Sequence, residues 1–174
     1  MEQFDAHRAA HASRAPDMSN KRHEDEAKLM SADDGLFNWV APPVGIPCAH
    51  MAASEVDGLW DEGKKYLWII RTNDVVTAQE NSEFAKTLGR TRLSHTNLTG
   101  GADAHTGGEL WFISDNKILI NGGSSRYKPR TMEELISAAD GFRKTGYTVG
   151  NMGFDNGIPA RRVRESDVTW SNHE

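Results

Sequence analysis

Cysteine is almost absent from this sequence, which has Cys48 alone among 174 residues. A single thiol cannot form an internal disulfide, and by itself it cannot build a thiolate zinc cluster. Because an unpaired cysteine is usually a small buried side chain, we expect Cys48 to lie in the core. The sequence therefore excludes a disulfide-stabilised scaffold, and it offers Cys48 no recognisable base partner for a role as nucleophile.

Long apolar runs are missing as well. No stretch approaches the roughly 18 apolar residues that a membrane-spanning helix needs, and residues 1–28 lack the apolar centre of a secretion signal. We therefore expect no membrane partner. The sequence predicts a cytoplasmic protein, or one that is delivered without a conventional signal peptide.

Positive charge is not in excess. The chain has 20 Lys and Arg residues against 25 Asp and Glu residues, which gives a net charge of −5. Broad electrostatic capture of nucleic acid needs a basic surface, so the composition argues against a duplex DNA partner. A local basic patch could still bind a phosphate, which leaves a nucleotide or RNA as a possible partner.

The order of the predicted elements indicates an α+β fold. Residues 1–33 are polar and carry no apolar stripe, so we interpret them as an irregular polar arm, either a solvated helix or a segment that orders on a partner. Residues 34–154 are predicted to form a single α+β domain with a mostly antiparallel sheet, and residues 155–174 a polar C-terminal tail. A chain of this length can bury one substantial core.

Several short runs rich in β-branched and aromatic residues predict the strands. They are Tyr66–Arg71, Val75–Thr77, residues 92–98 ("RLSHTNL"), residues 108–114 ("GELWFIS") and an edge strand in residues 147–154 ("YTVGNMGF"). Asp115-Asn116 joins two apolar runs and tolerates positive φ, which predicts the turn of a central hairpin.

One well-defined helix is predicted after that hairpin. Thr131 with Glu134 three residues later is a capping-box pattern, Pro129 blocks extension backward, and Gly146 can end the helix in a left-handed conformation. Four apolar residues recur at helical spacing and are expected to face the core: Leu135, Ala138, Ala139 and Phe142.

The candidate chemistry lies in residues 91–129, and His95 is its centre. An imidazole titrates near neutral pH, and the neighbouring Ser94, Thr96 and Thr99 offer hydroxyls that could fix its tautomer or bind an oxyanion. These residue types suit acid–base catalysis. They also suit a hydrogen-bonded structural histidine, so both interpretations stay open.

Paired glycines and a basic cluster accompany His95. Gly100-Gly101, Gly107-Gly108 and Gly122-Gly123 could form amide nests for a phosphate, or simply turns. Arg126 could clamp a phosphate and Tyr127 could stack on a base or donate a proton, although Ser124–Lys128 could equally be a capped turn before the helix. His95, His105 and Glu109 match no metal-binding spacing, so we predict no metal.

The order of these motifs also carries a resemblance. "LWIIR", "RLSHTNLTGG", "TGGELWF" and "SSRYKP", followed by the predicted helix, are similar to a module shared by plant IQ-motif calmodulin-binding proteins and by fungal and bacterial effector-like proteins. The similarity covers residues 66–149. It implies that the signature positions of the module are His95, Thr96, Gly100, Gly101, Gly108, Ser125, Tyr127 and Pro129.

Two departures from that module matter for its chemistry. The module's His-Ser-Ser is His95-Thr96-Asn97 here, and its Ser-Gly-His-Tyr is Ser124-Ser125-Arg126-Tyr127. A guanidinium stays protonated, so Arg126 cannot replace a second acid–base histidine, but it can hold a phosphate. No IQ-type helix is visible, so calmodulin binding does not carry over.

The leading hypothesis is an effector- or toxin-like catalytic module that acts on a nucleotide or phosphodiester. His95 would transfer the proton with Thr96 and Tyr127, while the substrate would be held by Ser125, Arg126 and the glycines at 100, 101 and 108. The reaction would be RNA cleavage, or ADP-ribosyl transfer from NAD as cofactor, in which His95 and Thr96 would hold the nicotinamide ribose and Glu109 would be the acidic residue. The alternatives are a non-catalytic protein-interaction module, and a structural subunit whose arm wraps a neighbour through residues 1–33.

Overall fold

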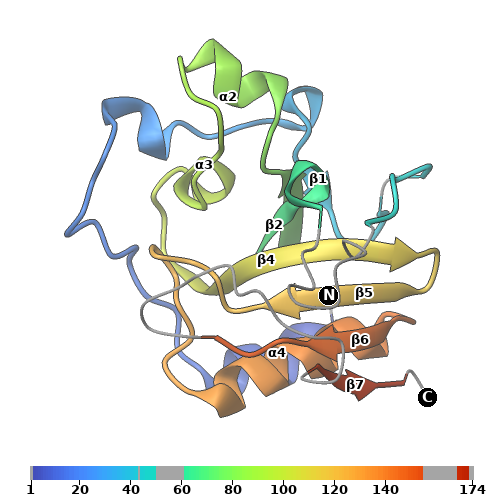
Figure 1. Ribbon diagram of the computed structural model, residues 1–174. Helices are drawn as coiled ribbons and strands as arrows, with labels where there is room; N and C mark the ends of the chain where they lie inside the picture. Colours follow the sequence, from blue (N-terminus) through green and yellow to red (C-terminus); the bar gives the residue numbers. More distant parts are fainter. Residues whose placement is uncertain (1, 43, 50–60, 155–167, 173–174) are drawn as a thin grey trace.

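The computed structural model describes residues 2–42, 44–49, 61–154 and 168–172. They form a seven-stranded sheet in the order β1-β3-β2-β4-β5-β6-β7, in which every neighbouring pair is antiparallel except β5 and β6 (Figure 1). One main helix, α4, follows the β4–β5 hairpin. The predicted α+β class with a mostly antiparallel sheet is therefore confirmed.

The strands are β1 (Phe37–Asn38), β2 (Tyr66–Arg71), β3 (Val75–Gln79), β4 (Ala104–Ser114), β5 (Lys117–Asn121), β6 (Thr148–Asn151) and β7 (Thr169–Ser171). The α-helices are α1 (Asp5–Ala10), α2 (Glu83–Thr87), α3 (Thr96–Thr99) and α4 (Met132–Lys144). Short 3₁₀ turns cover Glu2–Phe4, Glu24–Ala27, Ala32–Asp34 and Glu62–Lys64. Among the helices of this described part, none is long and apolar enough to cross a membrane.

Both faces of the sheet are buried, which explains why β2 is apolar at almost every position. Trp68 and Ile70 pack in the same apolar cluster as Phe142 of α4, whereas Leu67 and Ile69 join Leu98 of α3 in the opposite cluster. This alternation is the two-residue period of a strand. Figure 1 shows the result, with α4 on one side of the β4–β5 hairpin and α2 and α3 on the other.

The hairpin and the main helix form as predicted. The turn at Asp115-Asn116 joins β4 to β5, although no residue other than glycine has positive φ in the described ranges. At the start of α4, the Thr131 hydroxyl accepts a hydrogen bond from the Glu134 amide at 3.2 Å. The Glu134 carboxylate does not return to Thr131 but accepts from the Arg130 amide at 2.7 Å, so only half of the capping box forms.

Three local predictions are wrong. Residues 92–98 do not form a strand, because Asn97 Oδ1 accepts a hydrogen bond from the Ser94 amide at 2.9 Å and starts the short helix α3. β6 is not an edge strand, since β7 pairs with its free side. Cys48 is exposed rather than buried, although the neighbouring Ala49 belongs to an apolar cluster.

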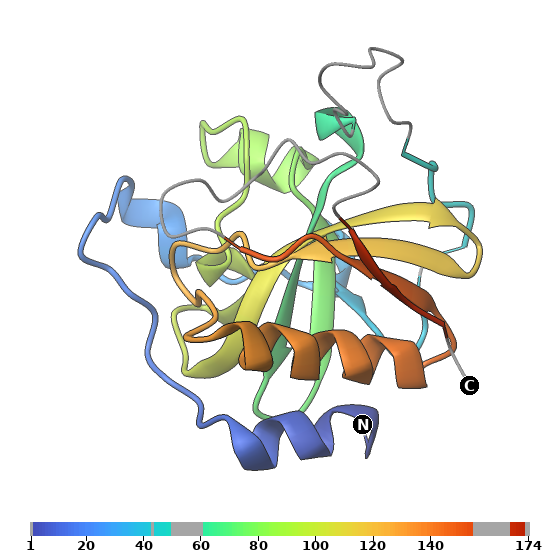
Figure 2. The ribbon, with the colours of Figure 1, turned by 60° about the horizontal axis from the view of Figure 1, so that its bottom comes forward.

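The N-terminal arm is largely exposed, but a few buried side chains pack it on its own domain. Phe4 is fully buried and lies 5.1 Å from the Phe142 ring, a contact that Gly141 permits because a Cβ there would come within 2.4 Å of the Phe4 ring. Figure 2 shows α1 beside α4. The boundaries at residues 33 and 155 stay predictions, and residues 155–167 of the expected tail lie outside the described residues.

A buried histidine fastens the arm and predicts acid sensitivity. His7 is 1% exposed, and its Nε2 lies 3.2 Å from the Thr106 hydroxyl. Burial is the main cause that lowers its pKa from 6.5 to about 4, and His11 and His105 add to the shift against the opposing effect of Glu134. As the pH falls, His7 is therefore protonated in the unfolded chain before it is protonated in the folded protein. The stability that the neutral His7 contributes is fully present above pH 6.5 and is lost as the pH falls toward 4.

Between pH 7 and pH 4 the free energy of unfolding should fall by about 3 kcal/mol less in His7→Gln than in the wild type. Urea unfolding at both pH values measures the difference. Glutamine keeps a donor for Thr106 but has no proton to gain. His23→Gln, at an exposed position of the arm, is the matched control and should follow the wild type. Equal acid loss in His7→Gln and wild type would contradict the assignment.

Candidate functional site

A cavity of about 590 Å³ opens between the arm, the loop that precedes α3, the start of β2, the end of β3, the middle of β4, and the segment after β5. We call it the arginine cleft. It is lined by Arg22, His23, Glu26, Lys65, Leu67, Glu80, Arg90, Thr91, Arg92, Leu93, Ser94, His95, Glu109, Gly123, Ser125 and Arg126. Its volume is within the usual range of small-ligand sites, about 300–1,000 Å³.

The charge of the cleft is opposite to the charge of the chain. Five Lys and Arg residues and three Glu residues line it, so its net charge is +2, whereas the whole chain carries −5. Arg90 is the least satisfied of these cations: its Nη2 donates to the Ser94 hydroxyl at 3.0 Å, but its buried Nη1 has no hydrogen-bond partner. A buried donor without a partner is costly, so an anion that reached this atom would gain a strong hydrogen bond.

His95 forms part of the cleft wall at the start of α3. Its Nε2 lies 2.9 Å from the carbonyl oxygen of Gly108, and because that oxygen only accepts, Nε2 carries the hydrogen. Gly107 lets the ring lie close to β4, since a Cβ there would come within 2.8 Å of the ring. Burial lowers the pKa of His95 from 6.5 to about 4. The imidazole is therefore neutral at physiological pH and keeps a lone pair on Nδ1.

Lys65 is the centre of an acidic group in the cleft. Its Nζ lies 2.6 Å from Glu109, 3.0 Å from Glu80 and 2.7 Å from Glu62. Burial acts to lower the pKa of Lys65, but Glu109 and Glu80 outweigh it and raise the pKa above its usual value. Burial raises the pKa of Glu109 above its usual value, although Lys65 opposes the shift. The Glu109 carboxylate also accepts a hydrogen bond from the side-chain amide of Asn121 at 3.1 Å.

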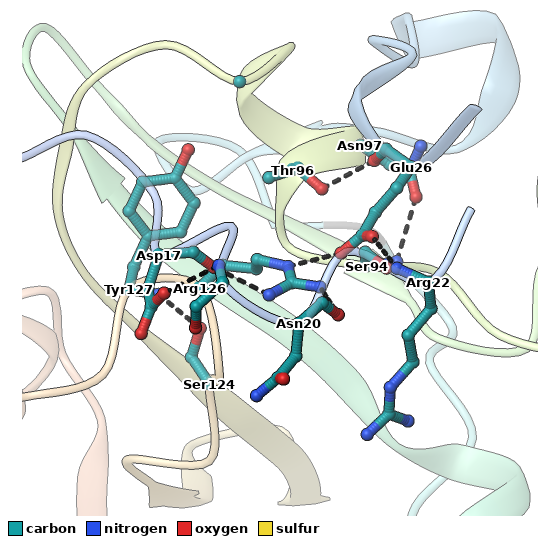
Figure 3. A network of polar contacts seen from close by, with 12 residues as sticks. Asp17, Asn20, Arg22, Glu26, Ser94, Thr96, Asn97, Ser124, Arg126 and Tyr127 are labelled. Carbon is teal, nitrogen blue, oxygen red and sulfur yellow. Dashed lines mark hydrogen bonds and ion pairs between the residues drawn. The ribbon is translucent and has the colours of Figure 1, made fainter. Parts of the chain in front are cut away.

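Arg126 holds the arm across one side of the cleft (Figure 3). Its Nε donates to the Glu26 carboxylate, its Nη1 to the Asp17 carbonyl at 2.7 Å and its Nη2 to the Asn20 carbonyl at 2.9 Å. Burial acts to raise the pKa of Glu26, but the hydrogen bonds from Arg126 and from the Arg22 amide lower it below its usual value. The guanidinium that we expected to bind phosphate is thus occupied by the chain itself.

The structure brings together only part of the predicted site. His95, Glu109, Ser125 and Arg126 all line the arginine cleft. The others lie outside its lining. They are Thr96, Tyr127, Gly100, Gly101 and Gly108.

Internal contacts explain the positions of those residues. The Thr96 hydroxyl donates to the Glu26 carbonyl at 2.6 Å, and the Tyr127 hydroxyl donates to the Ala102 carbonyl at 2.8 Å. Tyr127 also lies 2.7 Å from the Thr99 hydroxyl and is fully buried. Gly100 and Gly101 have φ of 66° and 79° and end α3, so they serve the turn there.

Six charged residues of the cleft were missed by sequence reasoning: Arg22, Glu26, Lys65, Glu80, Arg90 and Arg92. Lys65 directly precedes β2 and Glu80 directly follows β3, which pair antiparallel, so the hairpin places them side by side. A charged residue at each end of a predicted hairpin was the available signal. No such signal existed for Glu26, which lies 100 residues from Arg126 in the chain.

The described part of the chain contains no group of three or more His, Cys, Asp or Glu side chains arranged to hold a metal ion. His7, His11 and His105 come closest, with the His7 ring centroid 4.9 Å from that of His11 and 6.3 Å from that of His105. However, His105 Nδ1 is already bonded to the His11 carbonyl at 2.7 Å. These imidazoles attach the arm to β4.

Comparison of the chain with protein-family models, with curated protein sequences and with solved structures found no match. The chemistry of the arginine cleft therefore has to be argued from its own residues.

Proposed function

We propose that the protein acts on a nucleotide or phosphodiester bound in the arginine cleft. The observation that carries this proposal is the buried, unpartnered Nη1 of Arg90 in a cleft with a net charge of +2. A phosphate oxygen would satisfy that donor, and charge-assisted hydrogen bonds to phosphate are about twice as strong as neutral ones. The exposed side chains of Arg22 and Arg92 stand at the same cleft and add to the attraction.

His95 supplies the proton transfer in this proposal. Its lowered pKa keeps it neutral, so it acts as the base that removes a proton from an attacking hydroxyl or water, with Nδ1 as the accepting atom. The Gly108 carbonyl fixes this tautomer. RNA cleavage uses such a base to activate the attacking hydroxyl. In ADP-ribosyl transfer from NAD, where the acceptor attacks the ribose carbon and nicotinamide leaves, His95 would deprotonate the acceptor and Glu109, which also lines the cleft, would be the acidic residue.

Ligand binding by an Arg90 variant tests the proposal. We expect the wild type to bind ADP, NAD or a short single-stranded RNA. In Arg90→Gln the dissociation constant should rise at least tenfold, because one charge-assisted hydrogen bond is lost. Isothermal titration at low and at moderate salt measures both values. Lys86→Gln removes the same charge from exposed α2, where Lys86 pairs only with Glu83, and should bind like the wild type.

If a folded wild-type protein binds none of the three probes, the proposal is wrong. Binding that is equal in wild type and Arg90→Gln would place the ligand elsewhere.

The non-catalytic interaction module is the second candidate. It is favoured by one observation: all three nitrogens of the Arg126 guanidinium, which stands where the resembling module has a histidine, donate to the arm. Under this alternative the cleft binds an acidic partner without turnover. The arm that would wrap a neighbour in the structural hypothesis packs here on its own domain, through Phe4, His7 and Glu26.

A further inference from the structure

The arginine cleft has two chemically different parts. Arg90, Arg92 and Arg22 provide cations from the loop before α3 and from the arm. The sheet side provides Lys65 with Glu80 and Glu109, and Glu62 also bonds to Lys65. One ammonium group surrounded by three carboxylates leaves an excess of negative charge there. A ligand that fills the cleft therefore needs an anionic end and an end that tolerates carboxylates.

Glu80 is the carboxylate with a free acceptor. Its Oε2 lies 3.0 Å from Lys65 Nζ, whereas its Oε1 makes no hydrogen bond with any described residue. The side chain is 11% exposed and lines the cleft. By contrast, Glu109 uses both oxygens, one on Lys65 and one on Asn121. Glu62 does not line the cleft and is 61% exposed.

The backbone holds Glu80 in place. Its amide donates to the Lys65 carbonyl at 2.9 Å, and its carbonyl accepts from the Leu93 amide at 2.9 Å. The first bond ties Glu80 to the β2–β3 hairpin, and the second ties it to the loop that carries Arg90 and Arg92. The carboxylate and the arginines are therefore fixed relative to one another, which is the arrangement that reading two parts of one ligand requires.

The chemistry of the sheet side selects the ligand group. A phosphate would be repelled by the carboxylates, and an ammonium group is already supplied by Lys65. Sugar hydroxyls remain, since they donate to a carboxylate at no charge cost. A single Asp or Glu that accepts from the ribose hydroxyls is a recurring way to recognise a ribonucleotide.

We propose that Glu80 recognises the ribose hydroxyls of a ribonucleotide whose phosphate is bound by Arg90. This inference rests on the proposed function and gives it a substrate class. It separates ribonucleotides and RNA from their deoxy counterparts through a residue outside the 91–129 segment.

Binding of ADP and of 2′,3′-dideoxy-ADP to the full-length protein tests the inference without any substitution. We expect the wild type to bind ADP about tenfold or more tightly, because the dideoxy compound leaves the Glu80 carboxylate without its donors. In Glu80→Gln this ratio should fall to about one third of its value or less, with dideoxy-ADP bound as in the wild type. Glu62 also pairs with Lys65 but lies outside the cleft lining, so Glu62→Gln should keep the full preference for ADP over dideoxy-ADP.

The possible failures are distinguishable. Equal binding of ADP and dideoxy-ADP by the wild type would overturn the ribose assignment and leave the proposed function standing. A preference for ADP that persists in Glu80→Gln would move the recognition to another residue. If neither compound binds, the proposed function fails and the inference fails with it.

Discussion

Replacing His95 with glutamine is expected to lower the turnover of a nucleotide or phosphodiester substrate by about 10²–10⁴-fold, the usual contribution of one positioned base. Glutamine can still donate a hydrogen bond to the Gly108 carbonyl, so the fold and the ligand affinity should change little. The measurement is a single-turnover rate with saturating RNA, and separately with NAD, for wild type and variant. The reaction that depends on His95 is the one that the protein catalyses.

The pH profile provides an independent check on His95. Because burial lowers its pKa to about 4, the imidazole is neutral throughout the range above that value. The wild-type rate should therefore stay constant between pH 7 and pH 5, where an ordinary histidine base would lose most of its activity. A rate that falls with an apparent pKa near 6.5, or a variant as fast as the wild type, would show that His95 is not the base.

Replacing Arg126 with methionine is expected to destabilise the protein by about 3–5 kcal/mol, because it leaves the Glu26 carboxylate buried without its cation. Both side chains are nearly inaccessible, at 5% and 2% exposure, so water cannot replace the lost partner. Urea unfolding at pH 7 gives the loss. The same variant should make residues 17–30 sensitive to limited proteolysis, since Arg126 bonds to three points of that segment.

Two controls separate this effect from a general loss of charge. Lys86→Met breaks a fully exposed pair with Glu83 and should cost at most about 1 kcal/mol. The double variant Glu26→Gln, Arg126→Met removes both charges and should be more stable than Arg126→Met alone. An Arg126→Met variant no less stable than Lys86→Met would show that the arm is held by its other contacts.

Local sequence patterns predicted most of the fold, for reasons visible in particular elements. β2 is a continuous run of apolar residues and α4 has an apolar stripe at helical spacing, and their ends carry a turn residue or a cap. Residues 92–98 were wrongly predicted as a strand because their apolar alternation is short. The Asn97 side chain instead accepts a hydrogen bond from the Ser94 amide and donates one to the Lys28 carbonyl of the arm. The conformation of this segment depends on a tertiary contact with the arm, which the local sequence pattern could not show.

The site was harder to predict because its residues meet only through long-range contacts. His95, Ser125 and Arg126 were found since they lie in one unusual stretch. Lys65 and Glu80 resemble ordinary charged residues at the ends of strands. Their place in the site becomes clear only in the folded sheet, where β4 brings Glu109 beside them. Tyr127 shows the opposite case: a residue type that is common in binding sites is fully buried here and packs in the same apolar cluster as Leu98 of α3.

The arm's contacts have a consequence for the order of folding. The chain separates His7 from Thr106 by 99 residues, Glu26 from Arg126 by 100 and Arg14 from Glu134 by 120. Closing loops of that length costs entropy that local elements such as the β4–β5 hairpin and α4 do not incur. The arm is thus expected to dock after these local elements have formed, because Phe4 has no pocket to enter until α4 is in place. During that interval the arginine cleft lacks the wall that Glu26 and Arg22 provide, so the cleft takes its final shape only with the last step of folding.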